Sequence, residues 1–419
     1  MQVRRSVLLA AAVFSVTSLL WAGLVLAQGP RPFQEVFPNA KVEWELTLPN
    51  PYPNGQIVGC EDGFVLITND RTHLYRYNAE GKKLWELSDI KRLPYGEGGK
   101  MIGGIWRALV SRDGRFVYVK RDAGLATKPA EEYTHEGLLG LSEPQGEYFN
   151  AQGNSLWKRE EPPYMERISP GGKYLMTQFD PMSERQELVV VSGKDGTILW
   201  RREGEIGIWA AEFATDERIV YYKHPTLYLF DSATGNAIWE LDMRPHFKRF
   251  DFEGIAHPQI TASREGKRIV LFGYYALGKS AVISLDGQGN ILWIRAGLPR
   301  ILSAQVSGSG KTLFIPGYGS SRLINNDTGT DLWTQRTYFS WIENDLIQVT
   351  RNFIIASGYI KPDKMSGTGF FTLNKTGELQ SLRKFKEIAI PVNSPLGILQ
   401  KAILIRKGPG KVEFLRVTF

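Results

Sequence analysis

The sequence predicts an all-β protein, an eight-bladed β-propeller of four-stranded antiparallel blades, with seven blades as the alternative count. Two patterns predict this fold because they alternate strictly along the 419 residues. One pattern is a glycine four positions before a tryptophan, and the other is a polar turn followed by a run of Val, Ile, Phe and Tyr. Together, one copy of each pattern marks one unit of four strands.

The glycine and tryptophan pattern marks a turn that leads into a strand. Its copies are Gly81 and Trp85, Gly153 and Trp157, Gly196 and Trp200, Gly235 and Trp239, Gly289 and Trp293, and Gly329 and Trp333. Glycine suits the positive φ of a tight turn, and the alternation that follows is typical of a strand. Trp44 stands in a similar segment that lacks the glycine. We expect these tryptophans to pack between neighbouring blades.

The second pattern predicts a hairpin. Its clearest copies are Ser111–Gly114, Ser169–Gly172, Ser263–Gly266 and Ser307–Gly310. A short β-rich run bounded by such polar turns is typical of a strand hairpin. A further copy begins at Thr215 but has no glycine.

The two ends of the propeller are expected to join in one blade. Residues Ile398–Phe419 supply three strands without a tryptophan strand after them, whereas Lys41–Leu48 supplies a tryptophan strand alone. Pairing them closes the last blade with the N-terminal strand and hides the sheet edges at the seam.

Residues 1–27 are predicted to be a signal peptide or an N-terminal membrane anchor. Arg4 and Arg5 precede a long apolar run that ends in small residues at Ala27, which is the pattern of an export signal. The run is also long enough to span a bilayer. Both alternatives place residues 28–419, a single propeller domain, outside the cytoplasm, in the periplasm or the extracellular space.

Charge and cysteine content exclude several classes of function. The chain has 51 Lys and Arg against 44 Asp and Glu, a net charge of +7, without a basic run. We therefore expect no nucleic-acid partner, and membrane contact only through the N-terminal segment. Cys60 is the single cysteine, so no intramolecular disulfide can form.

The repeats resemble those of the pyrroloquinoline-quinone-type β-propeller family, in which an Asp-x-x-Thr-Gly turn precedes a tryptophan. Asp231–Trp239 matches this motif closely, and Asn325–Trp333 matches it with Asn in place of Asp. The resemblance covers nearly the whole chain after residue 27 and implies blades rather than an activity. The family includes quinoprotein dehydrogenases as well as a non-enzymatic branch, such as the lipoprotein of outer-membrane barrel assembly, which is a protein-binding scaffold.

The sequence offers no recognisable reactive group. Quinoprotein dehydrogenases use a vicinal cysteine pair and a calcium site, but Cys60 is alone and no Asp-x-Asp-x-Asp loop occurs. The five histidines show no metal-ligand spacing. We therefore predict no catalytic, cofactor-binding or metal-binding residues, and no cofactor.

A long insertion at about residues 123–149 is the predicted binding loop, with Lys128, Tyr133, His135 and Tyr148 as candidate contact residues. A solvated surface loop is the alternative. Tyr95, Trp106 and Trp209 are further candidates to line one face or the channel. The sequence thus favours a non-catalytic exported scaffold that binds a protein or another envelope component. The alternatives are a quinone- or metal-dependent oxidoreductase and a receptor for a small ligand or glycan.

Overall fold

The structure, a computed structural model, describes most of the chain between residues 41 and 416. The described residues are 41–47, 56–68, 71–88, 93–95, 100–102, 104–121, 145–160, 165–178, 186–204, 209–250, 253–276, 278–317, 320–335, 339–342, 348–349, 353–360, 368–374, 379–384, 397–399, 402–406 and 411–416. Residues 1–27, the expected signal peptide or anchor, lie outside this part. Within it, no helix is both long and apolar enough to span a membrane.

The strands form consecutive antiparallel sheets, which we number in chain order. Sheet 1 contains β2 (Gln56–Cys60), β3 (Gly63–Ile67), β4 (Leu74–Asn78) and β5 (Lys83–Leu87). Sheet 2 contains β8 (Ile105–Val110), β9 (Phe116–Arg121), β10 (Gln145–Asn150) and β11 (Ser155–Glu160). Sheet 3 contains β12 (Met165–Ile168), β13 (Tyr174–Gln178), β14 (Gln186–Ser192) and β15 (Ile198–Gly204).

The next three sheets repeat the same order of four strands. Sheet 4 contains β16 (Trp209–Thr215), β17 (Arg218–Lys223), β18 (Thr226–Asp231) and β19 (Ala237–Asp242). Sheet 5 contains β20 (Ala256–Ala262), β21 (Arg268–Ala276), β22 (Lys279–Asp286) and β23 (Ile291–Pro299). Sheet 6 contains β24 (Gln305–Val306), β25 (Thr312–Pro316), β26 (Ser321–Asn325) and β27 (Asp331–Gln335).

Two further sheets include the last part of the chain. Sheet 7 contains β28 (Phe339–Ile342), β29 (Gln348–Val349), β30 (Phe353–Ile360), β31 (Thr368–Asn374) and β32 (Leu379–Lys384). Sheet 8 contains β33 (Gly397–Leu399), β34 (Ala402–Arg406), β35 (Lys411–Arg416) and β1 (Lys41–Thr47). In sheet 8 the N-terminal strand β1 runs antiparallel to β35, and Trp44 lies opposite Phe414.

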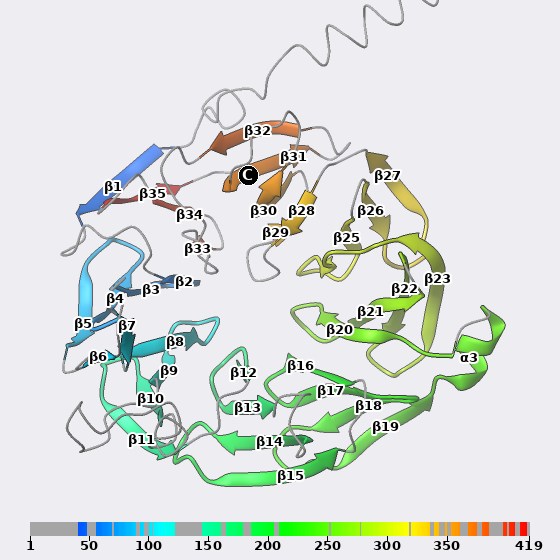
Figure 1. The fold of residues 1–419 in the computed structure, drawn as a ribbon, viewed down its shortest axis with the longest axis horizontal. Helices are drawn as coiled ribbons and strands as arrows, with labels where there is room; N and C mark the ends of the chain where they lie inside the picture. Colours follow the sequence, from blue (N-terminus) through cyan, green and yellow to red (C-terminus); the bar gives the residue numbers. More distant parts are fainter. Residues whose placement is uncertain are drawn as a thin grey trace, which may run out of the picture.

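The sheets lie side by side around a central axis (Figure 1). Strands of successive sheets are neighbours in the order β33, β2, β8, β12, β16, β20, β24 and β29, which are the first strands of their sheets except for β29 in sheet 7. Six of these sheets, between Gln56 and Gln335, are four-stranded and antiparallel. Their cores consist of Val, Ile, Leu, Phe and Tyr side chains buried between adjacent sheets.

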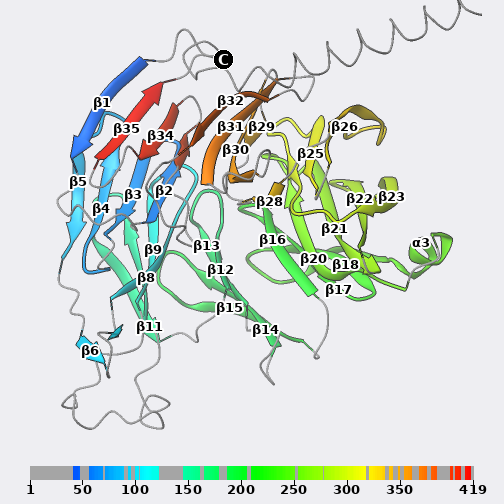
Figure 2. The same ribbon diagram turned by 45° about the horizontal axis from the view of Figure 1, so that its top comes forward.

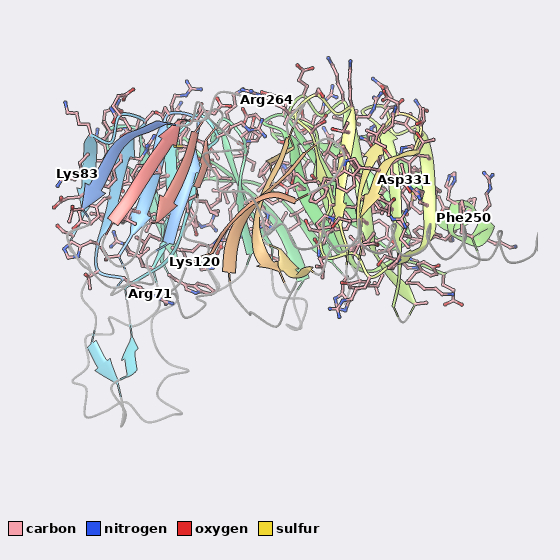
Figure 3. All side chains as sticks on the ribbon, turned by 90° about the horizontal axis from the view of Figure 1, so that it is seen from above. Arg71, Lys83, Lys120, Phe250, Arg264 and Asp331 are labelled. Carbon is pink, nitrogen blue, oxygen red and sulfur yellow. The ribbon has the colours of Figure 1, made fainter. Side chains whose placement is uncertain are left out.

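The ring has two distinct faces. The turns that join the first strand of a sheet to the second, and the third to the fourth, lie on what we call the turn face. Figure 3 shows Lys83, Arg264 and Asp331 toward this face, and Arg71 and Lys120 toward the other. That other face, which we call the insertion face, carries the loops between second and third strands and between sheets.

Two short elements lie between sheets. The hairpin of β6 (Leu93–Tyr95) and β7 (Lys100–Ile102) projects from the insertion face between sheets 1 and 2 (Figures 2 and 3). Helix α3 (Arg244–Arg249) lies outside the ring between sheets 4 and 5 (Figures 1 and 2). Its Phe247 is buried in the core.

Each of five repeat tryptophans docks onto the following sheet. The indole Nε1 of Trp200, for example, donates a 2.8 Å hydrogen bond to the Ser232 carbonyl in the next sheet. The same bond is made by Trp85 to Ala151, Trp157 to Gly193, Trp239 to Gly287, and Trp293 to Asn326. The tryptophans thus join sheets 1 to 6 in series, because each ring covers apolar surface and satisfies its N–H group across the boundary.

The turn glycine of the next sheet makes room for each indole. Gly235 has φ of 70°, and a Cβ at this position would lie 2.7 Å from Cδ2 of Trp200. Gly153, Gly196, Gly289 and Gly329 stand against the preceding tryptophan in the same way. The glycine therefore has two roles, one in its own turn and one in the contact between sheets.

Polar side chains fix both kinds of turn. The Asp231 carboxylate accepts hydrogen bonds from the backbone N–H of Ala233 and Thr234, at 3.1 and 2.8 Å, which is an Asx-type turn. In the other turn, the Ser111 hydroxyl accepts a 3.0 Å bond from the Phe116 N–H. Ser169, Ser263 and Ser307 repeat that bond.

Candidate functional site

Trp106 is the residue that departs most clearly from the repeat. It stands between Ile105, which pairs with Arg121, and Arg107, which pairs with Lys120, so it is the extra residue of a β-bulge at the start of β8. Its side chain is 43% exposed. A bulge re-aims the side chain that it carries and is often found beside functional sites. Trp106 is therefore presented to solvent at the insertion-face end of sheet 2.

A buried ion pair lies beneath this tryptophan. Lys120 and Glu166 are 0% and 2% exposed and form a salt bridge between sheets 2 and 3. The Lys120 Nζ lies 4.8 Å from the centroid of the Trp106 ring, within the range of a cation–π interaction. Burial raises the pKa of Glu166, although the positive charges of Lys120 and Arg107 oppose this effect. The pair holds a cation under an exposed aromatic ring.

A second buried carboxylate lies at the same end of sheet 2. Glu147, at the start of β10, is 3% exposed and forms an ion pair with Arg121. Its other oxygen lies 3.1 Å from Nζ of Lys158. Buried charges are costly unless they are paired. Two buried carboxylates with cationic partners, Glu147 and Glu166, are therefore concentrated at this end of sheet 2.

Two segments that depart from the repeat adjoin this site in the sequence. The β6–β7 hairpin immediately precedes β8, which carries Trp106. The long connection from β9 to β10 runs from Arg121 to Gln145. Trp, together with Tyr and Arg, is enriched among the residues that dominate binding at protein interfaces. We define Trp106, Lys120 and Glu166 as the candidate binding site.

The structure describes only one of the four residues that the sequence assigned to a binding loop. Lys128, Tyr133 and His135 lie outside the described residues. Tyr148 needs a correction, because it lies within β10 and is 0% exposed. Its hydroxyl donates a 2.6 Å hydrogen bond to the Gly172 carbonyl.

Tyr148 is a packing residue for a clear reason. Its ring stacks on Trp157 with centroids 5.1 Å apart, and burial raises its pKa. The strand β10 begins at Gln145, before the expected end of the insertion, so Tyr148 faces the neighbouring sheet. The sequence signal that could have shown this is the position of Tyr148, five residues before the turn glycine Gly153 and therefore within the strand that leads into that turn.

Two features that quinoprotein enzymes use, a metal-binding cluster and a cysteine pair, do not occur among the described residues. Within them, no group of three or more His, Cys, Asp or Glu side chains is arranged to hold a metal ion. Cys60 is buried as a free thiol and donates a hydrogen bond to Asp62 at 3.2 Å. Burial raises the pKa of Cys60 to about 12, so the thiol stays protonated and unreactive.

Sequence reasoning missed the partners of Trp106. Lys120 and Glu166 are 46 residues apart and belong to different sheets, so nothing in the local pattern relates them. The available signal was the interruption of apolar runs by charge, with Lys120 following Val117–Val119 in a buried strand.

Comparison with known proteins identifies the fold. Residues 147–276 match the family model described as outer membrane protein assembly factor BamB. BamB from Moraxella catarrhalis is similar in structure, with 14% identity, a TM-score of 0.53, and coverage of 90% of this chain and 98% of that chain. No curated protein matches the chain in sequence.

Propellers of other kinds are similar to the same extent. Sqt1 of Saccharomyces cerevisiae has 12% identity and a TM-score of 0.55, covering 90% of this chain and 99% of that one. The C-terminal WD40 domain of Sif2 has 11% identity and a TM-score of 0.53, covering 89% and 99%. The fold is therefore that of a β-propeller, and the resemblance to the PQQ-like repeat family drawn from Asp231–Trp239 is confirmed over residues 147–276.

Proposed function

We propose that this chain is a non-catalytic scaffold of the cell envelope that binds a protein through Trp106 and the surrounding insertion-face end of sheet 2. The observation that carries the proposal is the exposed Trp106 ring on a bulge over the buried Lys120 and Glu166 pair. The residue is 43% exposed, so part of the ring is available to a partner. Its contact with the buried Lys120 restrains the side chain, which lowers the entropy cost of binding.

The envelope location rests on two supports. Residues 1–27 have the pattern of a signal peptide or membrane anchor. The family model that matches residues 147–276 is named for outer membrane protein assembly. We propose that residues 28–419 are exported and that the partner is an envelope protein.

We further propose that the ring has eight blades and is closed by β1. The support is the pairing of β1 with β35 in sheet 8, which lies beside sheet 1. Deletion of residues 40–50 should remove this closure and lower the melting temperature of the whole domain. Melting at the same temperature as the intact chain would contradict it.

The binding site is tested by capture from envelope extract. The Trp106→Ala variant should lose partners that the native chain retains. Ile238→Ala is the matched control, because Ile238 is 50% exposed but lies on the outer strand β19 of another sheet. Equal capture by both variants, with unchanged melting temperatures, would contradict the assignment of the site.

The enzyme alternative predicts a different result. A propeller that holds pyrroloquinoline quinone with Ca²⁺ should be stabilised by them, by about 2.7 kcal/mol at a hundred times the dissociation constant. We expect no shift in the melting temperature when the quinone and Ca²⁺ are added. A stabilising shift would replace the scaffold proposal with the quinoprotein one.

A further inference from the structure

The turns between the first and second strands of sheets 1 to 6 have the same length but differ most at their second residue. Serine is the first residue in sheets 2, 3, 5 and 6, and glycine is the fourth in every sheet except sheet 4. The variable residues are Glu61, Arg112, Pro170, Asp216, Arg264 and Gly308. Figure 1 shows that these turns extend toward the axis of the ring. Turns of similar build thus carry a different residue at this position in each sheet.

Hydrogen bonds between neighbouring turns hold these residues in place. Glu61 N–H donates to the Arg112 carbonyl at 2.7 Å, and Arg112 N–H donates to the Pro170 carbonyl at 2.7 Å. Gly171 N–H then donates to the Asp216 carboxylate at 2.7 Å. The turns of sheets 1 to 4 are therefore joined to one another rather than independent, and we call the six turns together the collar.

An ion pair crosses the axis within this collar. Nη2 of Arg264, in sheet 5, lies 2.8 Å from Oε1 of Glu61, in sheet 1, although the two residues are 203 positions apart. The two side chains are 49% and 30% exposed. Figure 3 shows Arg264 on the turn face, the side opposite Lys120 and therefore opposite the candidate binding site.

Arg112 is a second arginine of these turns, and its backbone carbonyl accepts the hydrogen bond from Glu61. Burial and the positive charge of Arg264 lower the pKa of Arg112, and the negative charges of Glu61 and Asp216 oppose that effect. The charges of residues from sheets 1, 4 and 5 therefore act on Arg112. Among the described residues, no side chain forms a hydrogen bond with its guanidinium, so this cation has unused donors.

We propose that Arg112 and Arg264 form a second binding site, which holds a carboxylate of an acidic peptide segment. Guanidinium groups bind carboxylates through paired N–H donors. Glu61 already occupies Arg264 as an internal carboxylate, and the carboxylate of an incoming peptide replaces it while also engaging Arg112. The scaffold can then hold one partner on each face.

Fluorescence anisotropy with a labelled hexaglutamate peptide tests this site, with hexaglutamine as the uncharged comparison. Arg264→Ala and Arg112→Ala should each weaken hexaglutamate binding at least about tenfold, since each removes a charge-assisted pair. Glu61→Gln should strengthen it several-fold because it removes the competing carboxylate. Arg268→Ala is the matched control: Arg268 pairs with Asp327 at 2.6 Å outside the axial cluster, so this variant should bind as the native chain does.

Three results would overturn the proposal. The first is no hexaglutamate binding by either the native chain or Glu61→Gln, with melting temperatures showing that both are folded. The second is equal loss of binding in Arg268→Ala, and the third is stronger Arg264-dependent binding of tripolyphosphate or anionic lipid vesicles than of the peptide. Trp106→Ala should leave hexaglutamate binding unchanged, which separates this site from the proposed function.

Discussion

Sheets 2 and 4 follow one plan, yet they differ at one buried position near the insertion face. The positions of the two sheets can be matched through their strand pairing. Phe116 pairs with Asn150 in sheet 2, and Arg218 pairs with Asp231 at the corresponding place in sheet 4. Four residues further along the second strand, sheet 4 has Tyr222 and sheet 2 has Lys120, and both are fully buried. Sheet 4 fills the position with an aromatic ring, whereas sheet 2 places a cation there.

The loops that follow this position also differ between the two sheets, in their length. In sheet 4, β17 ends at Lys223 and β18 begins at Thr226, whereas in sheet 2 the corresponding strands end at Arg121 and begin at Gln145. The framework is thus repeated where sheets must pack, and the chemistry changes where the chain departs from the repeat. Departures from a repeat are therefore the better guide to function in this fold.

The largest effect should come from breaking the shared framework. Trp200→Ala removes the ring that joins sheet 3 to sheet 4 and its 2.8 Å bond to Ser232. We expect a loss of about 3–5 kcal/mol in the free energy of unfolding, as for other large-to-small core substitutions. Chemical denaturation measures this loss, and a change below about 1 kcal/mol would show that the tryptophans do not join the sheets.

The buried cation should matter almost as much as the framework. Lys120→Met leaves the Glu166 carboxylate buried without its partner, which should cost about 3 kcal/mol at neutral pH. Replacing both residues, as Lys120→Met with Glu166→Leu, should restore much of this stability. If the single variant were as stable as the native chain, the pair would have no energetic role.

The pH dependence of this variant has a definite sign. Burial raises the pKa of Glu166 in the folded state, and without Lys120 the opposing attraction is smaller. The folded state therefore binds the proton more tightly than the unfolded state, so the destabilisation should shrink as the pH falls toward the ordinary carboxyl pKa and grow as it rises. A constant difference between pH 4 and pH 8 would contradict this account.

Two glycines allow the backbone role and the packing role of the turn glycine to be measured separately. Gly235 and Gly278 both have φ of 70°, but a Cβ on Gly235 meets Trp200, whereas a Cβ on Gly278 meets nothing within 4 Å. Gly278→Ala should cost about 1–2 kcal/mol for the left-handed backbone alone. Gly235→Ala should cost about 1 kcal/mol more because the indole must move, and equal losses in thermal melting would remove the docking argument.

The smallest expected effect concerns an ion pair at the edge of the framework. Asp331 lies 2.7 Å from Nη1 of Arg322 and also pairs with Arg295 of sheet 5. Burial raises the pKa of Asp331, but the hydrogen bond and charge of Arg295, with the charge of Arg322, outweigh it and hold the pKa below the ordinary value.

The sign of this contribution follows from that shift. A lowered pKa stabilises the folded state above the ordinary pKa of about 3.8, and the stabilisation is lost as the pH falls below it. Asp331→Asn should therefore cost about 1 kcal/mol at pH 7 and almost nothing near pH 2. A difference that widened in acid would reverse the assigned sign.

Sequence periodicity was sufficient to predict the sheets because its cause is local. A glycine with positive φ and a tryptophan four residues later belong to one turn and the strand after it, so pairs such as Gly235 and Trp239 mark the same place in sheets 1 to 6. The pairing of β1 with β35 also followed, because an orphan strand needs an edge. Tyr148 was misplaced because a loop boundary is not periodic.

The candidate binding site could be predicted only in part, because Trp106 stands out in the sequence but the contacts of its surroundings join residues that are distant in sequence. Trp106 is exposed by a bulge that depends on pairing with β9, and Glu166 meets Lys120 only through contact between sheets. Arg264 and Glu61 meet only after the ring has brought sheets 1 and 5 to the axis. Such contacts appear once the repeated units are placed around a circle.

The most direct test of the central claim is photocrosslinking from single positions. A photoreactive amino acid replaces Trp106 in one protein and Ile238 in the other, and both are irradiated in cells that export the chain. We expect a discrete crosslinked envelope protein from position 106 and none from position 238. Crosslinks from position 238 alone, or the same product from both positions, would contradict it.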